Sequence, residues 1–359
     1  MLVPIRGRRP ARVAILYGAV AADATPDEQD VLVEVETVRA ALAALGYAPV
    51  AVPLTLDLEA ARARLLHLRP AFVFNLVESV DGLGQLIHLG PALLESLGLP
   101  YTGAASDAVL LTSKKTLAKR ILLSAGIDTP AWIETERGET PLPDFPGPYI
   151  VKSVWEHASI GIDAGSIVAD PGKLAPLIRR RQRRYGGVWF AERFIAGREF
   201  NLSLLAGAGG VELLPPAEMT FVDYPPAKPC IVDYAAKWHA GSFEFRNTVL
   251  RFDFPEADRP LLDRMTSVAR DCWSLFGLSG YARVDVRVDA QGRPWVLEVN
   301  VDPCLSPDAG FAAAAARIGL DAPAVVARIV ADRVVPALRP VARRPAPALP
   351  VDEVDRAVR

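Results

Sequence analysis

Apolar runs alternate with amphipathic segments over the first hundred residues. The stretches 13–17, 47–52 and 71–77 are apolar enough to be strands, and the segments 28–45 and 58–68 between them have helical patterns. Strands that are apolar throughout, with helices between them, are typical of a parallel sheet covered on both faces. We therefore expect an open α/β domain. Ligands of such sheets gather at the carboxyl ends of strands, so the loops after the first and third strands are candidate binding loops.

The pattern changes after a helix over 113–124, which ends at Gly126. A stretch rich in Pro and Gly from 130 to 148 then separates the first part of the chain from a second set of elements. These are strands at 149–152, 188–194, 199–205 and 211–214, helices near 174–184, 260–276 and 311–317, and a hairpin over 283–300. We expect four parts: an N-terminal α/β domain (1–110), a central unit (111–206), a third unit (207–335) and a loose Pro-rich tail (336–359).

The hairpin separates its side chains by chemistry. Centring the turn at 291–292 sets Asp285 opposite Glu298 and Arg283 opposite Asn300. The other face pairs apolar residues: Val284, Val286 and Val288 are expected opposite Val299, Leu297 and Trp295. One face is therefore core, and the other carries a pair of carboxylates.

Two carboxylates directly opposite each other repel unless a cation lies between them. The oxygens of Asp285, Glu298 and Asn300 suit Mg²⁺, a hard ion that keeps waters and shares substrate phosphates. The alternative interpretation is a solvated strand face whose acids are paired by Arg283 and Arg287.

Two lysines and two glutamates elsewhere suit a nucleotide with several phosphates. Lys152 ends an apolar strand, and Lys115 begins a helix, where a positive charge opposes the helix dipole. Glu192 and Glu199 flank a turn between two strands, where backbone groups could bind a base and a carboxylate could bind ribose hydroxyls. Each feature alone also fits an ordinary solvated surface.

The order of these features resembles the ATP-grasp superfamily, in particular its D-alanine:D-alanine ligase branch, from Val13 to Leu320. The resemblance is carried by Val73-Phe74-Asn75, 97–103, Lys115 with Lys119, Val151-Lys152, Glu192-x-Phe-Ile-x-Gly-x-Glu199, Arg283-Val284-Asp285 and Glu298-Val299-Asn300. It implies an α/β fold that is α+β in its ATP-binding part. In this ATP-grasp architecture an N-terminal open parallel α/β domain precedes two further subdomains that sandwich ATP. The central unit would then carry a loop, 155–162, that closes over the phosphates, and the third unit would carry the metal site.

The resemblance also implies residue roles. The nucleotide would be held by Lys115 and Lys152 at the phosphates, Glu192 and the backbone of Arg193, Phe194 and Ile195 at adenine, Glu199 at the ribose, and Ser159 in the closing loop. Asp285, Glu298 and Asn300 would ligate two Mg²⁺ ions, with Mn²⁺ as the alternative metal. Arg283 would face the developing oxyanion as a catalytic residue, beside Glu28 at the ammonium of the first substrate. The implied chemistry is phosphoryl transfer from ATP to a small-molecule carboxylate, followed by attack of an amine on the acyl phosphate. Related ligases are commonly dimers, so a homodimer is expected.

Several positions depart from that branch, and all of them concern the amino-acid substrates. Four positions carry another residue than the family: Trp238 replaces a tyrosine, Ala309 a serine, Cys304 a glycine and Glu78 a histidine. One serine of the closing loop is also missing, at 157–158. The loss of such contacts weakens the binding of D-alanine selectively. We therefore expect substrates other than two D-alanines, with Glu78 and Asp308 suited to a cationic or amine-bearing partner. A true D-alanine:D-alanine ligase of cell-wall synthesis and a nucleotide-binding module without turnover are the alternatives.

Composition narrows the choice of partner. The 359 residues carry a formal net charge of −2, so no basic field favours nucleic acid or an anionic membrane. Cys230, Cys272 and Cys304 have neither metal-ligand spacing nor an even framework, which favours a reducing compartment. The apolar run 13–17 is too short for a membrane span or a signal-peptide core, so a cytoplasmic protein is expected. The arginine-rich run 179–184 is expected to be a solvated helix end.

Overall fold

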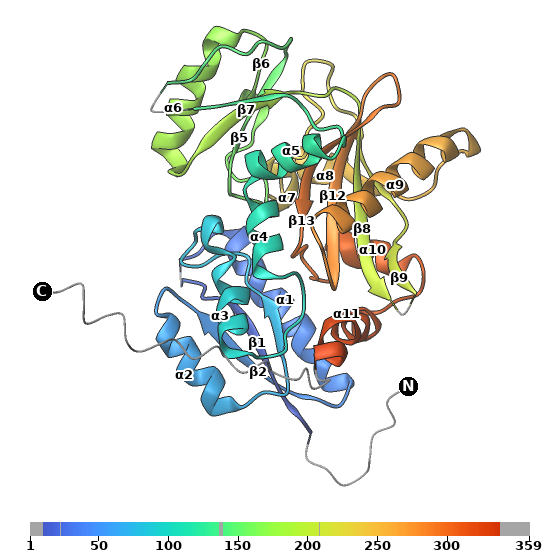
Figure 1. Cartoon of the computed structure of the whole chain (residues 1–359). Helices are drawn as coiled ribbons and strands as arrows, with labels where there is room; N and C mark the ends of the chain where they lie inside the picture. The colour runs from blue at the N-terminus through green and yellow to red at the C-terminus, as the bar shows by residue number, and fades with distance from the viewer. Residues whose placement is uncertain (1–9, 22, 136–138, 208, 338–359) are drawn as a thin grey trace, which may run out of the picture.

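The computed structural model describes residues 10–21, 23–135, 139–207 and 209–337. The strands form three sheets, one parallel and two antiparallel, as Figure 1 shows. The mixed α/β and α+β architecture expected from the sequence is confirmed. The Pro-rich tail expected over 336–359 lies outside the described residues from position 338 onwards.

The first part of the chain forms a parallel sheet in the order β2-β1-β3. Its elements are β1 (Arg12–Gly18), α1 (Pro26–Ala44), β2 (Ala48–Leu54), α2 (Leu58–Leu68), β3 (Val73–Leu76) and α3 (Leu89–Leu97). Alternate residues of β1 enter different cores: Val13 and Ile15 pack with α1, whereas Ala14 and Leu16 pack with α2 and α3. The sheet is thus covered on both faces, as its continuous apolar strands predicted.

The second sheet is antiparallel, in the order β4-β7-β5-β6, and carries one helix (Figure 1). Its elements are β4 (Trp132–Glu134), β5 (Tyr149–Ser153), β6 (Ile167–Val168), α6 (Leu174–Tyr185) and β7 (Trp189–Arg193). Leu174 and Ile178 of α6 pack against the buried Trp189. The arginines of the run 179–184 are exposed on α6 except for Arg181, which is buried and bound to Asp163. Helices α4 (Ser106–Ser113) and α5 (Lys115–Ser124) connect this unit to the first sheet.

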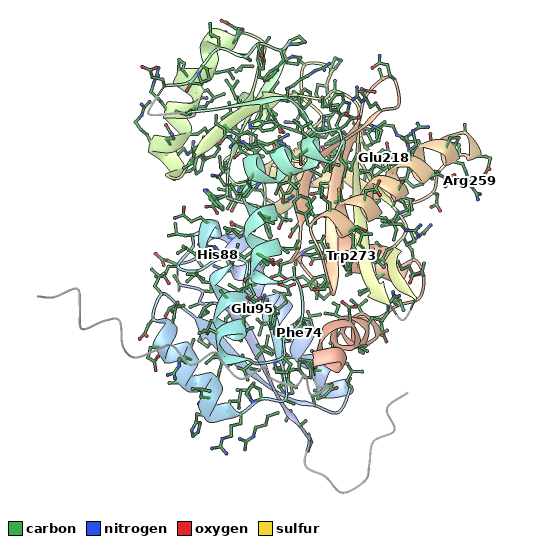
Figure 2. All side chains as sticks on the ribbon, viewed as in Figure 1. Phe74, His88, Glu95, Glu218, Arg259 and Trp273 are labelled. Carbon is green, nitrogen blue, oxygen red and sulfur yellow. The ribbon has the colours of Figure 1, made fainter. Side chains whose placement is uncertain are left out.

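The largest sheet has six strands, in the order β11-β10-β8-β12-β13 with β9 beside β8. Its elements are β8 (Arg198–Gly207), β9 (Gly210–Leu213), β10 (Ala217–Phe221), α7 (Tyr234–Trp238), α8 (Phe243–Asn247), β11 (Thr248–Arg251), α9 (Arg259–Leu275), β12 (Tyr281–Val288) and β13 (Pro294–Asn300). α9 covers one face, where Met265 packs with Phe200 and Val284, and Figure 2 shows Trp273 on the same helix. β8 pairs with β12 along its length, so it lies in this sheet rather than with the strands before residue 198.

Two C-terminal helices join the large sheet to the first one. Helices α10 (Gly310–Ala316) and α11 (Ala322–Ala337) contribute Phe311 and Ile329 to a core that also contains Ile15 of β1 and Tyr281 of β12. Because this core is shared, the first sheet is packed against the large one. Among the described residues, we find no helix with the length and apolar character needed to span a membrane.

Candidate active site

The hairpin of β12 and β13 has the predicted register at its functional end. Arg283 lies opposite Asn300 and Asp285 opposite Glu298. Beyond Asp285 the register shifts, which corrects our prediction: Val286 pairs with Val296 rather than Leu297, and Val288 pairs with Pro294 rather than Trp295. The reason is a bulge at Leu297, which adds one residue to β13 and so lets Val296 and Val299, three apart, both face the core.

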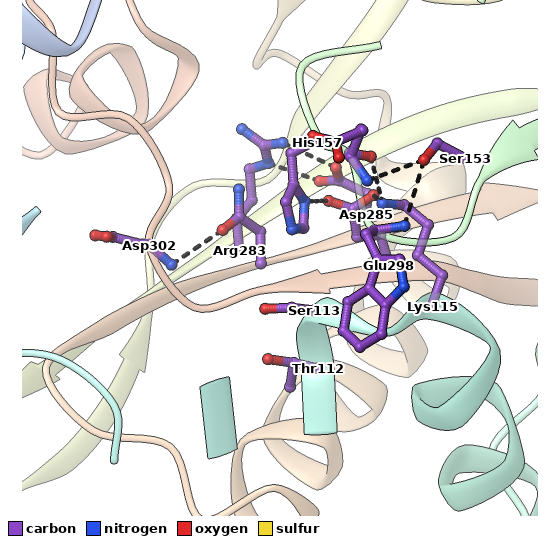
Figure 3. A network of polar contacts seen from close by, with 12 residues as sticks. Thr112, Ser113, Lys115, Ser153, His157, Arg283, Asp285, Glu298 and Asp302 are labelled. Carbon is purple, nitrogen blue, oxygen red and sulfur yellow. Dashed lines mark hydrogen bonds and ion pairs between the residues drawn. The ribbon is translucent and has the colours of Figure 1, made fainter. Parts of the chain in front are cut away.

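The two acids of the hairpin are bound by cations of the protein itself (Figure 3). Asp285 accepts hydrogen bonds from Nε and Nη2 of Arg283 at 2.7 and 2.9 Å and from Asn201 at 2.8 Å. Glu298 lies 2.6 Å from Nδ1 of His157 and 3.5 Å from Nζ of Lys115. Burial alone would raise the pKa of Glu298, but Lys115 and His157 outweigh it and hold that pKa well below its usual range. Glu298 therefore remains charged, and the basic side chains around the two acids come from several elements.

Lys115 and the loop after β5 approach Glu298 from the other side. Lys115 is the first residue of α5, is buried, and donates from Nζ to the carbonyl oxygen of Glu156 at 2.6 Å. The loop is also held by Ser159, whose hydroxyl donates to the carbonyl oxygen of Val232 at 2.8 Å. The segment expected to close over the phosphates thus lies between α5, β13 and the chain leading to α7.

Lys152 and Glu192, which we predicted at different parts of the nucleotide, are direct neighbours. Nζ of Lys152 lies 2.7 Å from one carboxylate oxygen of Glu192, and Nζ of Lys119 lies 2.7 Å from the other. Glu192 and Lys119 are fully buried. Burial would raise the pKa of Glu192, but the two lysines lower it, whereas burial lowers the pKa of Lys119 to about 8. This strand position therefore carries a buried carboxylate with two cations.

Arg287 organises the turn that carries the other nucleotide-binding candidates. It donates from Nε and Nη2 to Glu199 at 2.9 and 2.7 Å, and from Nη1 to the carbonyl oxygen of Ile195 at 2.8 Å. Its guanidinium also stacks on Phe194, 4.7 Å from the ring centre. The backbone N–H of Arg193 donates to the carbonyl oxygen of Ala131, the residue before β4. The expectation that Arg283 and Arg287 pair the two hairpin acids is therefore wrong for Arg287, whose partner is Glu199.

Glu28 lies in the first turn of α1, at the edge of the site. One of its oxygens accepts from the backbone and hydroxyl of Thr25, and the other faces Gly82, where an added Cβ would lie 3.2 Å away. Two residues further on, Asp30 accepts from the thiol of Cys304 at 3.0 Å and from the hydroxyl of Ser306 at 3.2 Å. Of these two acids, Asp30 is the one that contacts the segment following β13.

The donor set of the hairpin fits a hard divalent cation. Asp285 and Glu298 lie opposite each other, and Asn300 is the last residue of β13, two positions after Glu298. The amide oxygen of Asn300 accepts from the backbone N–H of Asp302 at 3.0 Å. Within the described part of the chain, no cluster of three or more His, Cys, Asp or Glu residues is placed to bind a metal. Two carboxylates and one amide match a Mg²⁺ ion that completes its coordination with water and phosphate oxygens.

Comparisons with known proteins agree with this geometry. A family model described as D-ala D-ala ligase C-terminus matches residues 124–331. D-alanine–D-alanine ligases from Moorella thermoacetica and an Anaeromyxobacter species are each 31% identical to this chain. The matches cover 82% and 89% of this chain, and 91% and 96% of the two relatives. The crystal structure of D-alanine–D-alanine ligase from Bacillus anthracis complexed with ATP superimposes with a TM-score of 0.70 at 22% identity, over 91% of this chain and 98% of that one.

The chain belongs to the D-alanine–D-alanine ligase family. It is therefore an ATP-dependent ligase that forms carbon–nitrogen bonds, as the order of its motifs predicted. The family match begins in α5 and ends in α11, so it contains both antiparallel sheets and the hairpin.

The structure adds residues to which the sequence had assigned no role in this ligase. His157, Lys119 and Asn201 each contact a predicted site residue, and Lys237 of α7 is partly buried with no hydrogen bond or ion pair to any described residue. Burial, and then the nearby Arg283, lower the pKa of Lys237. Lys119 lies one helical turn beyond Lys115, so its spacing could have identified it. His157 has no such signal, because it reaches Glu298 from a distant part of the sequence.

The substituted positions of this ligase have structural partners of their own. The indole N–H of Trp238 donates to the carbonyl oxygen of Ala158 in the closing loop at 3.0 Å. Tyr234, one turn earlier in α7, donates to Asp27 of α1 at 2.6 Å. Cys304 binds Asp30, as described above, and Asp308 is exposed. Trp238 and Cys304 therefore each have a hydrogen-bond partner of their own in this structure.

Proposed function

We propose that this ligase activates a substrate carboxylate with ATP as an acyl phosphate and joins it to an amine. The observation that carries the proposal is the convergence of Lys115, His157 and Arg283 on the carboxylates of Asp285 and Glu298. Two cations and an imidazole, brought by separate elements to two acids, match the alternating charges of a metal-bound triphosphate. A structural ion pair alone needs no such number.

Each predicted residue has a role in this proposal. Lys115, Lys152 and Lys237 would bind phosphates, with Ser159 holding the loop over them. Glu192 and the backbone of Arg193, Phe194 and Ile195 would bind adenine, and Glu199 would bind ribose once released from Arg287. Asp285, Glu298 and Asn300 would hold Mg²⁺. When bound, Mg²⁺ neutralises the phosphate charges and orients the γ-phosphate.

In the first step a carboxylate oxygen attacks the γ-phosphorus, and the bond to ADP breaks. In the second, an amine attacks the acyl carbon, phosphate leaves, and an amide forms. Nε and Nη2 of Arg283 are bound to Asp285, while its Nη1 has no partner among the described residues. This group would donate to the oxyanion of the tetrahedral intermediate, while the closing loop excludes water from the acyl phosphate. Glu28 would act at the substrate ammonium, from the start of α1.

The domain organisation supports the same proposal. We propose an N-terminal substrate domain (1–110), a central subdomain with the closing loop (from 111) and a third with the metal site (to 335), the nucleotide lying between the last two. The boundary expected at 206 moves to 197, because β8 pairs within the large sheet. A cytoplasmic homodimer is also proposed, because the activity needs intracellular ATP and related ligases are commonly dimers.

Two D-alanines are the alternative substrates, favoured by the names of the relatives. Against them stand Trp238 and Ala309 at positions that we expect to contact the amino acids. Phosphate release should be measured pairwise over D- and L-amino acids and amines with ATP and Mg²⁺. Release that needs both a carboxylate and an amine, and that is lost in Arg283→Ala, is expected. The absence of release with every pair, despite ATP binding, would overturn the proposed turnover.

A further inference from the structure

Four carboxylates lie close together near Arg283, in the part of the site where we propose that the substrates bind. Asp30 and Glu34 lie one turn apart on α1, Glu78 follows β3, and Asp302 follows β13. Each interacts electrostatically with at least one of the others. We call these four residues the acidic group. Glu34 and Asp302 are buried, whereas Asp30 and Glu78 are partly exposed and form the open side of the group.

The charge balance of the acidic group differs from that of the nucleotide side. Where we propose that the nucleotide binds, each of four acids is paired with lysine, arginine or histidine: Asp285, Glu298, Glu192 and Glu199. No member of the acidic group forms an ion pair with any described residue. Arg283 and Lys237 act on Glu78 only at longer range.

Neutral donors satisfy only part of the acidic group. Glu34 accepts from the backbone N–H of Leu305 at 2.7 Å, and Asp302 accepts from the hydroxyl of Tyr281. The second oxygen of each carboxylate, Oε2 of Glu34 and Oδ2 of Asp302, is buried with no hydrogen-bond partner. An unpartnered buried carboxylate oxygen is costly, and burial together with the neighbouring acids raises the pKa of Glu34. A cationic ligand among these unpartnered oxygens would relieve both costs.

The spacing of the acidic group does not suit a metal ion. Among the described residues, no three His, Cys, Asp or Glu side chains lie close enough together to hold one ion. The acidic group is thus too widely spaced for one small ion. It suits an ammonium or guanidinium group, which is larger and donates several hydrogen bonds.

We propose that the acidic group binds a cationic nitrogen of the substrate in addition to an α-ammonium, so that one substrate is a basic amino acid or a diamine. The inference rests on the proposed ligase function. A single α-ammonium needs one carboxylate, for which Asp30 or Glu28 suffices. Glu34, Glu78 and Asp302 exceed that need, and this excess indicates the second positive charge.

The test compares substrates that differ only in that charge. ADP formation is measured with lysine, ornithine, 1,4-diaminobutane, norleucine and alanine, each paired with itself and with D- and L-alanine. We expect a KM for lysine or ornithine, or for the diamine as amine, at least roughly tenfold below that of norleucine, the uncharged analogue of lysine. Equal or better use of norleucine or alanine would overturn the inference and leave the ligase function intact.

Variants then locate the effect. Glu34→Gln should reduce the preference for lysine over norleucine roughly tenfold without changing the KM for ATP. Glu36→Gln is the matched control, because Glu36 lies on the same helix, is exposed and binds Arg39. If Glu34→Gln fails to fold, which circular dichroism would show, the partly exposed Glu78→Gln is used instead. A preference unchanged in the folded variant would contradict the inference.

Calorimetry separates the two proposals. The full chain is titrated with lysine and with norleucine, in the presence of Mg²⁺ and a non-hydrolysable ATP analogue. Tighter binding of lysine than of norleucine, without turnover of any pair, would support cation binding by the acidic group and contradict the ligase proposal. Equal binding of lysine and norleucine would overturn the acidic group whatever the turnover.

Discussion

Replacing Glu192 by glutamine tests the buried charges beneath the nucleotide side. The carboxylate of Glu192 and the ammonium of Lys119 are each 1% exposed, and Lys152, its second partner, is 15% exposed. Removing one partner of a buried pair costs about 3 to 5 kcal/mol, because the remaining charge is uncompensated. Lys119 keeps Thr129 and the carbonyl oxygen of Pro130 as acceptors, at 2.7 and 2.9 Å. We therefore expect the lower end, a loss of about 3 kcal/mol in the free energy of unfolding.

The loss is measured by urea unfolding followed by tryptophan fluorescence and circular dichroism. Glu134→Gln is the matched control, since Glu134 lies on the neighbouring strand β4 and its partner Arg120 is 62% exposed. A surface pair of this kind contributes at most about 1 kcal/mol. Equal losses for Glu192→Gln and Glu134→Gln would refute the description of Glu192 as a buried charge held by two lysines.

The pH dependence of the Glu192→Gln loss follows from Lys119. Burial lowers the pKa of Lys119 to about 8, from 10.5 in the unfolded chain. The folded protein therefore holds this proton less tightly, and its stability rises as pH increases from about 8 to 10.5. Above pH 8, Lys119 loses its charge in the wild type, so its pairing with Glu192 contributes less. Glu192 raises the pKa of Lys119, so Glu192→Gln should lower that pKa further. The deficit of Glu192→Gln should therefore shrink as pH rises to about 8 and stay nearly constant above it, and a deficit that grew would contradict the reasoning.

Three further predictions concern the site itself. Arg283→Lys should lower kcat roughly a hundredfold, because the planar pair of guanidinium donors is lost, and should leave the KM for ATP within about twofold. Steady-state kinetics with one substrate pair measures both values. Asp285→Asn should raise the Mg²⁺ concentration for half-maximal ADP formation roughly tenfold, measured by metal titration after chelation, and an unchanged value would speak against Asp285 as a ligand. Burial, and then Asp30, raise the pKa of Glu78 from 4.5 to about 7, so the folded protein should lose stability as pH rises from 4.5 to 7. Glu78→Gln should flatten this part of a plot of melting temperature against pH. Parallel plots for the variant and the wild type would contradict the prediction.

Local patterns predicted the elements well because burial imposes them. The continuous apolar runs at β1, β2 and β3 require cover on both faces, and the structure supplies it with α1, α2, α3 and α11. The hairpin register near Asp285 followed from alternation of core and polar residues. Beyond it the prediction failed at Leu297, since a bulge keeps apolar residues inward while changing their partners, and alternation alone does not reveal it.

Residues of the site were harder to predict where they come from distant segments. His157 meets Glu298 across 141 positions, and only the fold brings them together. Glu34, in contrast, could have been found from the sequence. It lies between Val31, Val35 and Val38 on the apolar face of α1, where a charged residue is unexpected and therefore informative. Asp30 could have been found with it, because two acids one turn apart share a face of the helix.

Arg283 connects the two halves of this charge distribution. Its guanidinium is bound to Asp285 on the nucleotide side, and it also lowers the pKa of Glu78, although burial and Asp30 raise that pKa more. A substrate cation placed among the acidic group would compete with Arg283 for the charge of Glu78. Arg283 would then interact more exclusively with Asp285 and with an oxyanion at Nη1. On this argument, a basic substrate that fills the acidic group should also raise the rate of its own reaction, so lysine should exceed norleucine in kcat as well as in affinity.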